Sequence, residues 1–167
     1  MSKPSPPVST SRPASAAKQL AGFIAKFDPA IATLVRSARA ALRKRWPTAT
    51  ELVYDNYNAL AIGFGSTERA SDCIVSIAVY ARGVNLYFIY GRSLPDPHKL
   101  LQGGGSQGAF IRLETVSVLD RPEVDALLRA AARDAEPPLP KTGRGYTVIK
   151  AVSTRQRPRV LDPAGNG

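Results

Sequence analysis

The sequence has very few of the side chains that carry out covalent and metal chemistry. Its 167 residues include one cysteine, Cys73, and one histidine, His98. A single cysteine excludes an intrachain disulfide, and the apolar run "CIVSIAV" around Cys73 favours a buried hydrophobic side chain over a nucleophile. The chain shows no Ser-His-Asp order, no paired acidic dyad and no Cys/His cluster. We therefore expect no catalytic residue, no metal and no cofactor, which favours a protein that is not an enzyme.

Long apolar segments are also missing. No run reaches the roughly 18 to 20 apolar residues that a membrane-spanning helix needs. The N-terminal stretch "MSKPSPPVSTSRPASAAK" lacks the apolar centre of a signal peptide. From these two absences we expect a cytoplasmic protein that does not enter a membrane.

Acidic residues are scarce relative to basic ones. The chain has 13 Asp and Glu against 23 Lys and Arg, a formal net charge of +10. Nearly all of the excess lies in residues 1–26, with four basic and no acidic residues, and in residues 137–167, with six basic residues and one acidic residue. Basic segments attract polyanions. The two terminal regions are therefore candidate contacts for a polyanion such as nucleic acid.

Composition divides the chain into three parts. Residues 1–26 are rich in Pro, Ser and Ala and predict a basic, mostly disordered arm with a short helix in "AAKQLAGFIAKF", because such a segment buries little apolar surface. Residues 27–136 have the periodic patterns of a folded domain. Residues 137–167 form a basic tail with one short strand predicted in "YTVIK".

Two helices enclose the predicted domain. The first begins at Asp28, a good N-cap that Pro29 follows, and its apolar residues recur at helical spacing until Pro47. The second begins at Asp120, where Glu123 three residues later completes a capping-box pattern.

Four or five strands separate these helices. The runs "CIVSIAVY" and "VNLYFIY" predict a hairpin in which Gly83 supplies a positive φ angle, and "GAFIRLETVSV" predicts a further strand. Consecutive strands between two helices are typical of an α+β fold. We expect an antiparallel sheet of four to six strands, with the N- and C-terminal helices packed on one face.

The glycine-rich stretch "LQGGGSQG" resembles a phosphate-binding loop by its letters alone. It lacks the lysine of a P-loop, and it enters a strand where a dinucleotide-binding motif would enter a helix. Two interpretations stay open for Gly103, Gly104 and Gly105. They form either a tight turn or a nest of backbone N–H groups that holds an anion.

Polar and aromatic residues gather in "YDNYNAL". Tyr54, Asp55, Tyr57 and Asn58 fit a hairpin corner and equally well one wall of a polar pocket. His98 is expected at the surface, because one histidine near scattered carboxylates is a weak metal pattern.

Three segments together resemble the YdhG-like domain family, also called domain of unknown function 1801. They are "WPTATELVYDNYNALAIGF", "VNLYFIYGRSLPDPHKLLQGGGSQGAFIRLE" and "LLRAAA". The resemblance covers about residues 27–132 and implies a small α+β protein, mostly found in bacteria and without an assigned activity. One branch of the family is similar to frataxin and implies an iron chaperone. The basic charge of this chain opposes iron binding, which needs oxygen ligands at negative potential.

These patterns predict a non-enzymatic module that binds a small ligand or a partner, as a monomer or a homodimer. The first alternative is a nucleic-acid-associated basic protein that acts through its arms, and the second is the iron chaperone. The candidate ligand-binding residues are Tyr54, Asp55, Tyr57, Asn58, His98, Gly103, Gly104, Gly105 and Arg112.

Overall fold

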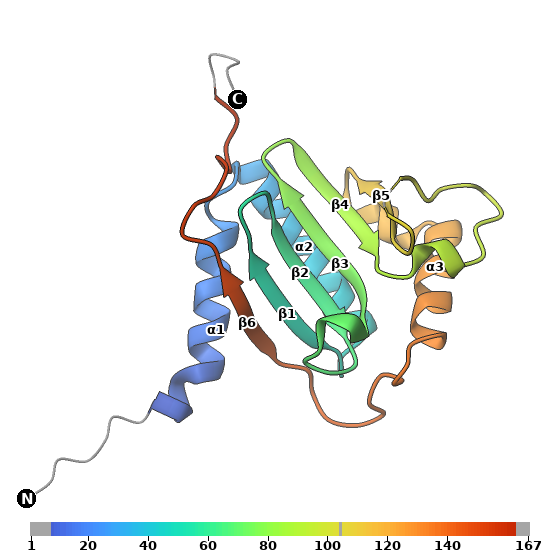
Figure 1. Cartoon of the computed structure of the whole chain (residues 1–167), viewed down its shortest axis with the longest axis horizontal. Coiled ribbons are helices and arrows are strands. Elements are labelled where there is room, and N and C mark those ends of the chain that lie inside the picture. Colours follow the sequence, from blue (N-terminus) through green and yellow to red (C-terminus); the bar gives the residue numbers. More distant parts are fainter. Residues whose placement is uncertain (1–7, 104, 163–167) are drawn as a thin grey trace, which may run out of the picture.

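A computed structural model describes residues 8–103 and 105–162, with side chains described from residue 15 onward, and shows helices around one sheet (Figure 1). The α-helices are α1 (Val8–Ile24), α2 (Pro29–Arg45) and α3 (Pro122–Arg133). The strands are β1 (Thr50–Asp55), β2 (Leu60–Gly65), β3 (Cys73–Tyr80), β4 (Gly83–Phe88), β5 (Ala109–Leu113) and β6 (Thr147–Val152). Three short 3₁₀ helices, η1 (Ala70–Asp72), η2 (Gly91–Ser93) and η3 (Val116–Asp120), lie in the connections. The α+β class expected from the sequence is confirmed.

The sheet has six strands in the order β5-β4-β3-β2-β1-β6. Strands β1 to β5 form an antiparallel meander, as expected. The expectation of a wholly antiparallel sheet is wrong at one edge, where β6 pairs with β1 in parallel. The reason is geometric: the chain leaves α3, returns past the start of β1 and then runs in the same direction as β1 (Figure 1).

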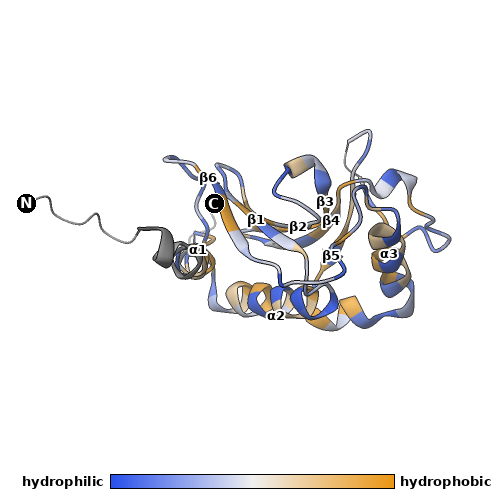
Figure 2. Cartoon of the chain, turned by 90° about the horizontal axis from the view of Figure 1, so that it is seen from below, coloured by the Kyte–Doolittle hydropathy of each residue, from blue (hydrophilic) through white to orange (hydrophobic). Residues whose placement is uncertain are grey.

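One hydrophobic core holds the helices against one face of the sheet. Helix α2 lies along this face (Figure 2) and buries Ala32, Val35, Ala38 and Leu42, which recur at helical spacing. Alternate residues of the strands, such as Val75 in β3, join the same core cluster. Burial of this apolar stripe provides the main stabilisation of the layer.

The predicted start of one helix agrees with the structure, and the predicted start of the other does not. Asp28 occupies the N-cap position of α2 and Pro29 its first turn, as predicted. Asp120 does not cap α3, because the chain first forms η3 and α3 begins at Pro122. Strand β5 consequently ends at Leu113, earlier than the apolar run through Val118 suggests.

Both terminal segments contribute to the fold. Leu20 and Ile24 of α1 are buried in the core cluster, and β6 completes the sheet. The short strand expected in the basic tail corresponds to β6, and α1 extends through residues that were expected to be mostly disordered. Residues 1–7 of the predicted arm lie outside the described residues. No helix among the described residues is long and apolar enough to cross a membrane.

The second face of the sheet carries no α-helix within the described residues (Figure 2). One row of this face runs in register across five strands and consists of Tyr54, Ala61, Ala78, Asn85 and Arg112. Small side chains occupy the middle of the row and large ones its ends. The uncovered face is therefore shallow over β2 and β3.

Candidate ligand-binding sites

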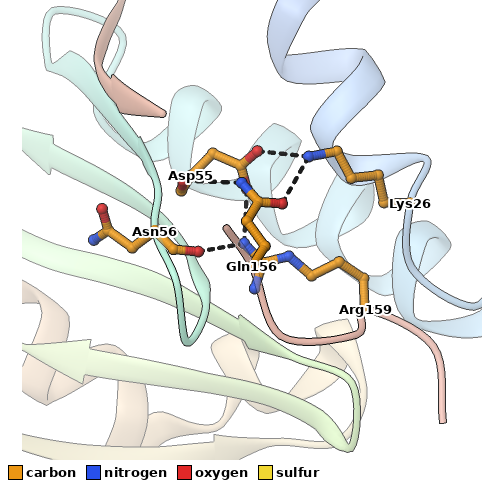
Figure 3. Close-up of polar contacts among 5 residues, drawn as sticks. All are labelled: Lys26, Asp55, Asn56, Gln156 and Arg159. Atoms are coloured by element: carbon orange, nitrogen blue, oxygen red, sulfur yellow. Dashed lines mark hydrogen bonds and ion pairs between the residues drawn. The ribbon is translucent and has the colours of Figure 1, made fainter. Parts of the chain in front are cut away.

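Asp55 lies at the centre of a buried polar cluster, which we call the Asp55 cluster (Figure 3). Lys26 at the end of α1 places Nζ 2.7 Å from one carboxylate oxygen, and Arg159 places Nη2 2.9 Å from the other. Gln156 donates its side-chain N–H to the backbone carbonyl of Asp55 and accepts a hydrogen bond from Lys26. Arg159 also donates to the carbonyl of Asn56 at 2.6 Å. The cluster ties β1 to α1 and to the segment that follows β6.

The electrostatics of this cluster identify Asp55 as an ionised structural group. Burial alone would raise the pKa of Asp55, but hydrogen bonds from Lys26, Gln156 and Arg159 outweigh it and lower the pKa. Both oxygens have cationic partners within 3 Å. Asp55 was among the candidate ligand residues, and the structure places it beneath the surface in this cluster.

Tyr57 and Asn58 lie at the rim of an open hollow on the uncovered sheet face, which we call the tyrosine hollow. Its volume is about 480 Å³. Ala61 and Ala78 form its floor, Tyr57 and Tyr80 flank it, and Asn56, Asn58, Ala59 and Ser153 complete the lining. The sequence segment "YDNYNAL" therefore contributes both a hairpin corner and a wall of this hollow, whereas Tyr80 comes from the far end of β3.

The other predicted residues lie elsewhere. Tyr54 and Arg112 stand at opposite ends of the row across the uncovered face. Arg112 donates to the carbonyl of Arg82 at 2.8 Å, and its guanidinium fills the space beside Gly83, whose φ is 152°. His98 is exposed and lines a separate recess next to Pro122 and Glu123.

The glycine stretch forms a supported turn. Gly103 has a φ of 41°, and a Cβ at this position would lie 3.2 Å from the ring of Phe110. Gln102 and Phe110 exchange backbone hydrogen bonds across the turn, and Arg92 donates to the Gly103 carbonyl. Gly105 is exposed with open space around its Cα. Gly104 lies outside the described residues.

A partly open cavity of about 300 Å³ lies where β3 begins, β4 ends and α3 ends. We call it the α3 cavity. Its apolar lining comes from Ile74, Phe88, Leu94, Ala131 and Ala135. Its polar lining comes from Ser71, Asp72, Tyr90, Ser93, Asp134 and Glu136. Cys73 is also a lining residue. Three acidic residues and no basic residue contribute to this lining, in a chain with a net charge of +10.

Cys73 is a protonated thiol in this setting. Burial raises the pKa of Cys73 to about 11, and the neighbouring carboxylate of Asp72 adds to the rise while Lys150 opposes it. The Tyr90 hydroxyl donates to the carbonyl of Ser71 at 2.6 Å and closes one side of the cavity. A thiolate is the reactive form of cysteine. The Sγ of Cys73 lies beside Gly63 of β2, and this thiol is a poor nucleophile near neutral pH.

Sequence reasoning missed the α3 cavity because three distant segments build it. Residues 71–74, 88–94 and 131–136 meet only when α3 packs beside β3. None of these segments carries a motif of its own. The one local signal for this cavity was the segment "AEPPLP" with its acidic residues at the end of the predicted helix. The same pattern is also found at an ordinary helix terminus.

No group of three or more His, Cys, Asp and Glu side chains within residues 8–103 and 105–162 is placed to hold a metal ion. Comparison of the chain with protein-family models, curated proteins and solved structures finds no match. The resemblance to the YdhG-like family therefore stays a prediction from the sequence.

Proposed function

We propose that this protein is a non-enzymatic binding module for a small molecule that occupies the α3 cavity. The observation that carries the proposal is the cavity itself, which joins an apolar floor to an exposed polar rim. Cavities that hold small ligands have volumes of roughly 300 to 1,000 Å³ and are apolar with a few placed polar groups. The α3 cavity, at about 300 Å³, lies at the small end of this range.

The rim specifies the charge of the ligand. Asp72, Asp134 and Glu136 line the cavity. Asp134 pairs with Arg133 at 3.3 Å, and Asp72 accepts a hydrogen bond from the Thr67 hydroxyl at 2.6 Å. Carboxylates beside an apolar floor favour a cation with an apolar body, such as an aryl or alkyl amine. The ring of Phe88 on the floor adds a surface on which such a body can pack.

A binding role fits the thiol better than a catalytic one. Cys73 has a pKa of about 11 and is protonated near pH 7. Its Sγ lies beside Gly63 of β2, and a catalytic role does not fit it because covalent catalysis requires the thiolate.

A thermal-shift series tests this proposal. Small arylalkyl amines are compared with carboxylates of the same carbon skeleton. We expect the amines to raise the melting temperature and the carboxylates to have no effect, because binding to the folded state alone stabilises it. Ala135→Phe should fill the cavity and abolish the shift. Ala40→Phe, at an exposed position of α2, is the matched control and should keep it.

A double variant tests whether the carboxylates select the charge of the ligand. Replacing both Asp134 and Glu136 by their amides should remove the preference for amines over carboxylates while the cavity keeps its shape. If neither class of compound shifts the melting temperature, or if the shift persists in Ala135→Phe, the α3 cavity is not the binding site.

A further inference from the structure

The tyrosine hollow combines two accessible aromatic side chains, with Tyr57 exposed to 45% and Tyr80 to 40%. Both border a floor of alanine side chains on the uncovered sheet face. Exposed aromatic rings over a flat floor provide faces on which planar molecules stack.

Basic residues lie next to the two tyrosines of this hollow, outside its lining. The guanidinium of Arg157 lies 5.8 Å from the centre of the Tyr57 ring, and the Arg157 backbone N–H donates to the Tyr57 carbonyl at 2.8 Å. Arg82 is exposed in the hairpin turn two residues after Tyr80, and Arg112 is exposed at the end of the row that crosses the floor.

The carboxylate nearest in sequence to the hollow does not offset this charge. Asp55 precedes the Asn56–Asn58 corner, but it is fully buried and has Lys26 and Arg159 as partners. Arg157 and Arg82, the basic residues next to the two tyrosines, therefore favour an anionic ligand with planar groups.

The corner also carries groups that can read the edge of a base. Asn56 and Asn58 are both exposed, and they flank Tyr57 in the sequence. A side-chain amide offers both donors and an acceptor. Unpaired bases are recognised by such groups together with aromatic stacking, whereas the bases of a duplex are stacked on each other and cannot reach the rings.

We propose that the tyrosine hollow binds single-stranded nucleic acid, with unpaired bases stacked on Tyr57 and Tyr80 and the phosphates held by Arg157, Arg82 and Arg112. This surface is distinct from the α3 cavity and does not depend on ligand binding there. It also differs from binding through flexible termini, because Arg157 belongs to a segment that the fold holds in place.

Fluorescence anisotropy with a short labelled oligothymidylate tests the proposal on the full chain. Tyr57→Ala and Tyr80→Ala should each weaken binding at least about fivefold, because one stacked base is lost. The slope of log K against log salt should stay unchanged in these variants. Tyr57→Phe keeps the ring and should restore the wild-type affinity. Tyr146→Ala is the aromatic control, since Tyr146 is 48% exposed beyond the opposite end of β1.

The arginine variants test the phosphate contacts through the salt dependence of binding. Arg157→Ala should reduce the salt slope by about 0.7, the contribution of one phosphate contact to a single strand. Arg129→Ala, at a 78% exposed position on α3, should leave the slope unchanged. Melting curves of each variant establish that it is folded.

Several outcomes overturn the proposal. Equal affinity for duplex and single strand, or tyrosine variants that bind as the wild type does, would show a nonspecific polyelectrolyte contact elsewhere on the chain. Binding of a neutral oligosaccharide in place of the oligonucleotide would assign the hollow to sugars. Absence of oligonucleotide binding at low salt removes the proposal altogether and leaves the α3 cavity untouched.

Discussion

Arg159 and Asp55 form a buried ion pair of 2.9 Å between segments 104 residues apart. The side chain of Arg159 is 5% exposed and that of Asp55 is fully buried. The guanidinium also lies 5.6 Å from the centre of the Phe27 ring, just before α2. This pair fixes the chain after β6 to the end of β1 and to the start of the helical layer.

Arg159→Ala should destabilise the fold strongly. Removal of one partner from a buried pair leaves an uncompensated charge and typically costs 3–5 kcal/mol. Lys26 remains beside Asp55 and offsets part of this loss, so we expect a decrease of about 3 kcal/mol in the free energy of unfolding. Urea denaturation measures it. Arg155→Ala, at an exposed position in the same segment, should change the value by less than about 0.5 kcal/mol. Equal midpoints for the two variants would contradict this role for Arg159.

The lowered pKa of Asp55 predicts how stability depends on acid. The folded state holds the carboxylate ionised to a lower pH than the unfolded chain does, so the contribution is complete above the unfolded pKa of about 3.9. It is lost as the pH falls through the lower pKa of the folded state. The difference in stability between wild type and Asp55→Asn should therefore shrink below about pH 4. A difference that grows as the pH falls would reverse the sign of the pKa shift.

Local sequence patterns predicted the central elements well. The run "CIVSIAVY" matches β3, and the apolar spacing after Asp28 matches α2. In α2 the burial of one face imposes a helical period that the residues display directly, and in β3 the β-branched residues of a short apolar run indicate a strand. The turn around Gly83 could be located for the same reason, because a hairpin leaves a local signature.

Long-range packing decided the parts that sequence reasoning missed. The short helix expected in "AAKQLAGFIAKF" is part of α1, but the sequence did not show that Leu20 and Ile24 on one of its faces pack into the core. Strand β6 gains its parallel partner only after the chain returns past β1, which no local pattern records. Likewise, Tyr57 was identified from its polar neighbours, whereas Tyr80 joins it only through the pairing of β2 with β3.

Gly145 tests whether the segment before β6 is fixed to the sheet. A Cβ at Gly145 would lie 1.7 Å from the carbonyl oxygen of Ala49, and the Gly145 N–H donates to Pro47 at 2.8 Å. Gly145→Ala must therefore push β6 away from β1 and should lower stability by about 1–3 kcal/mol. Gly105→Ala is the control, because a Cβ there meets open space. If thermal denaturation finds the two variants equally stable, the approach of this segment to Ala49 is looser than the structure shows.

The raised pKa of Cys73 predicts a loss of stability in alkali. The folded state keeps the thiol protonated up to a pKa of about 11, whereas the unfolded chain loses the proton near its ordinary pKa of about 8.5. The contribution is therefore complete below about pH 8.5 and declines as the pH rises toward 11. Between about pH 8 and about pH 10 the wild type should lose about 2 kcal/mol relative to Cys73→Ser.

The serine variant makes this measurement specific to the thiol. Serine does not titrate in this range, while the tyrosines and lysines titrate in both proteins and cancel in the difference. Urea denaturation at a series of pH values gives the two stability curves. Asp72→Asn should reduce the decline, because the Asp72 carboxylate contributes to the raised pKa of Cys73. Parallel curves for wild type and Cys73→Ser would mean that the thiol is solvated in the folded state.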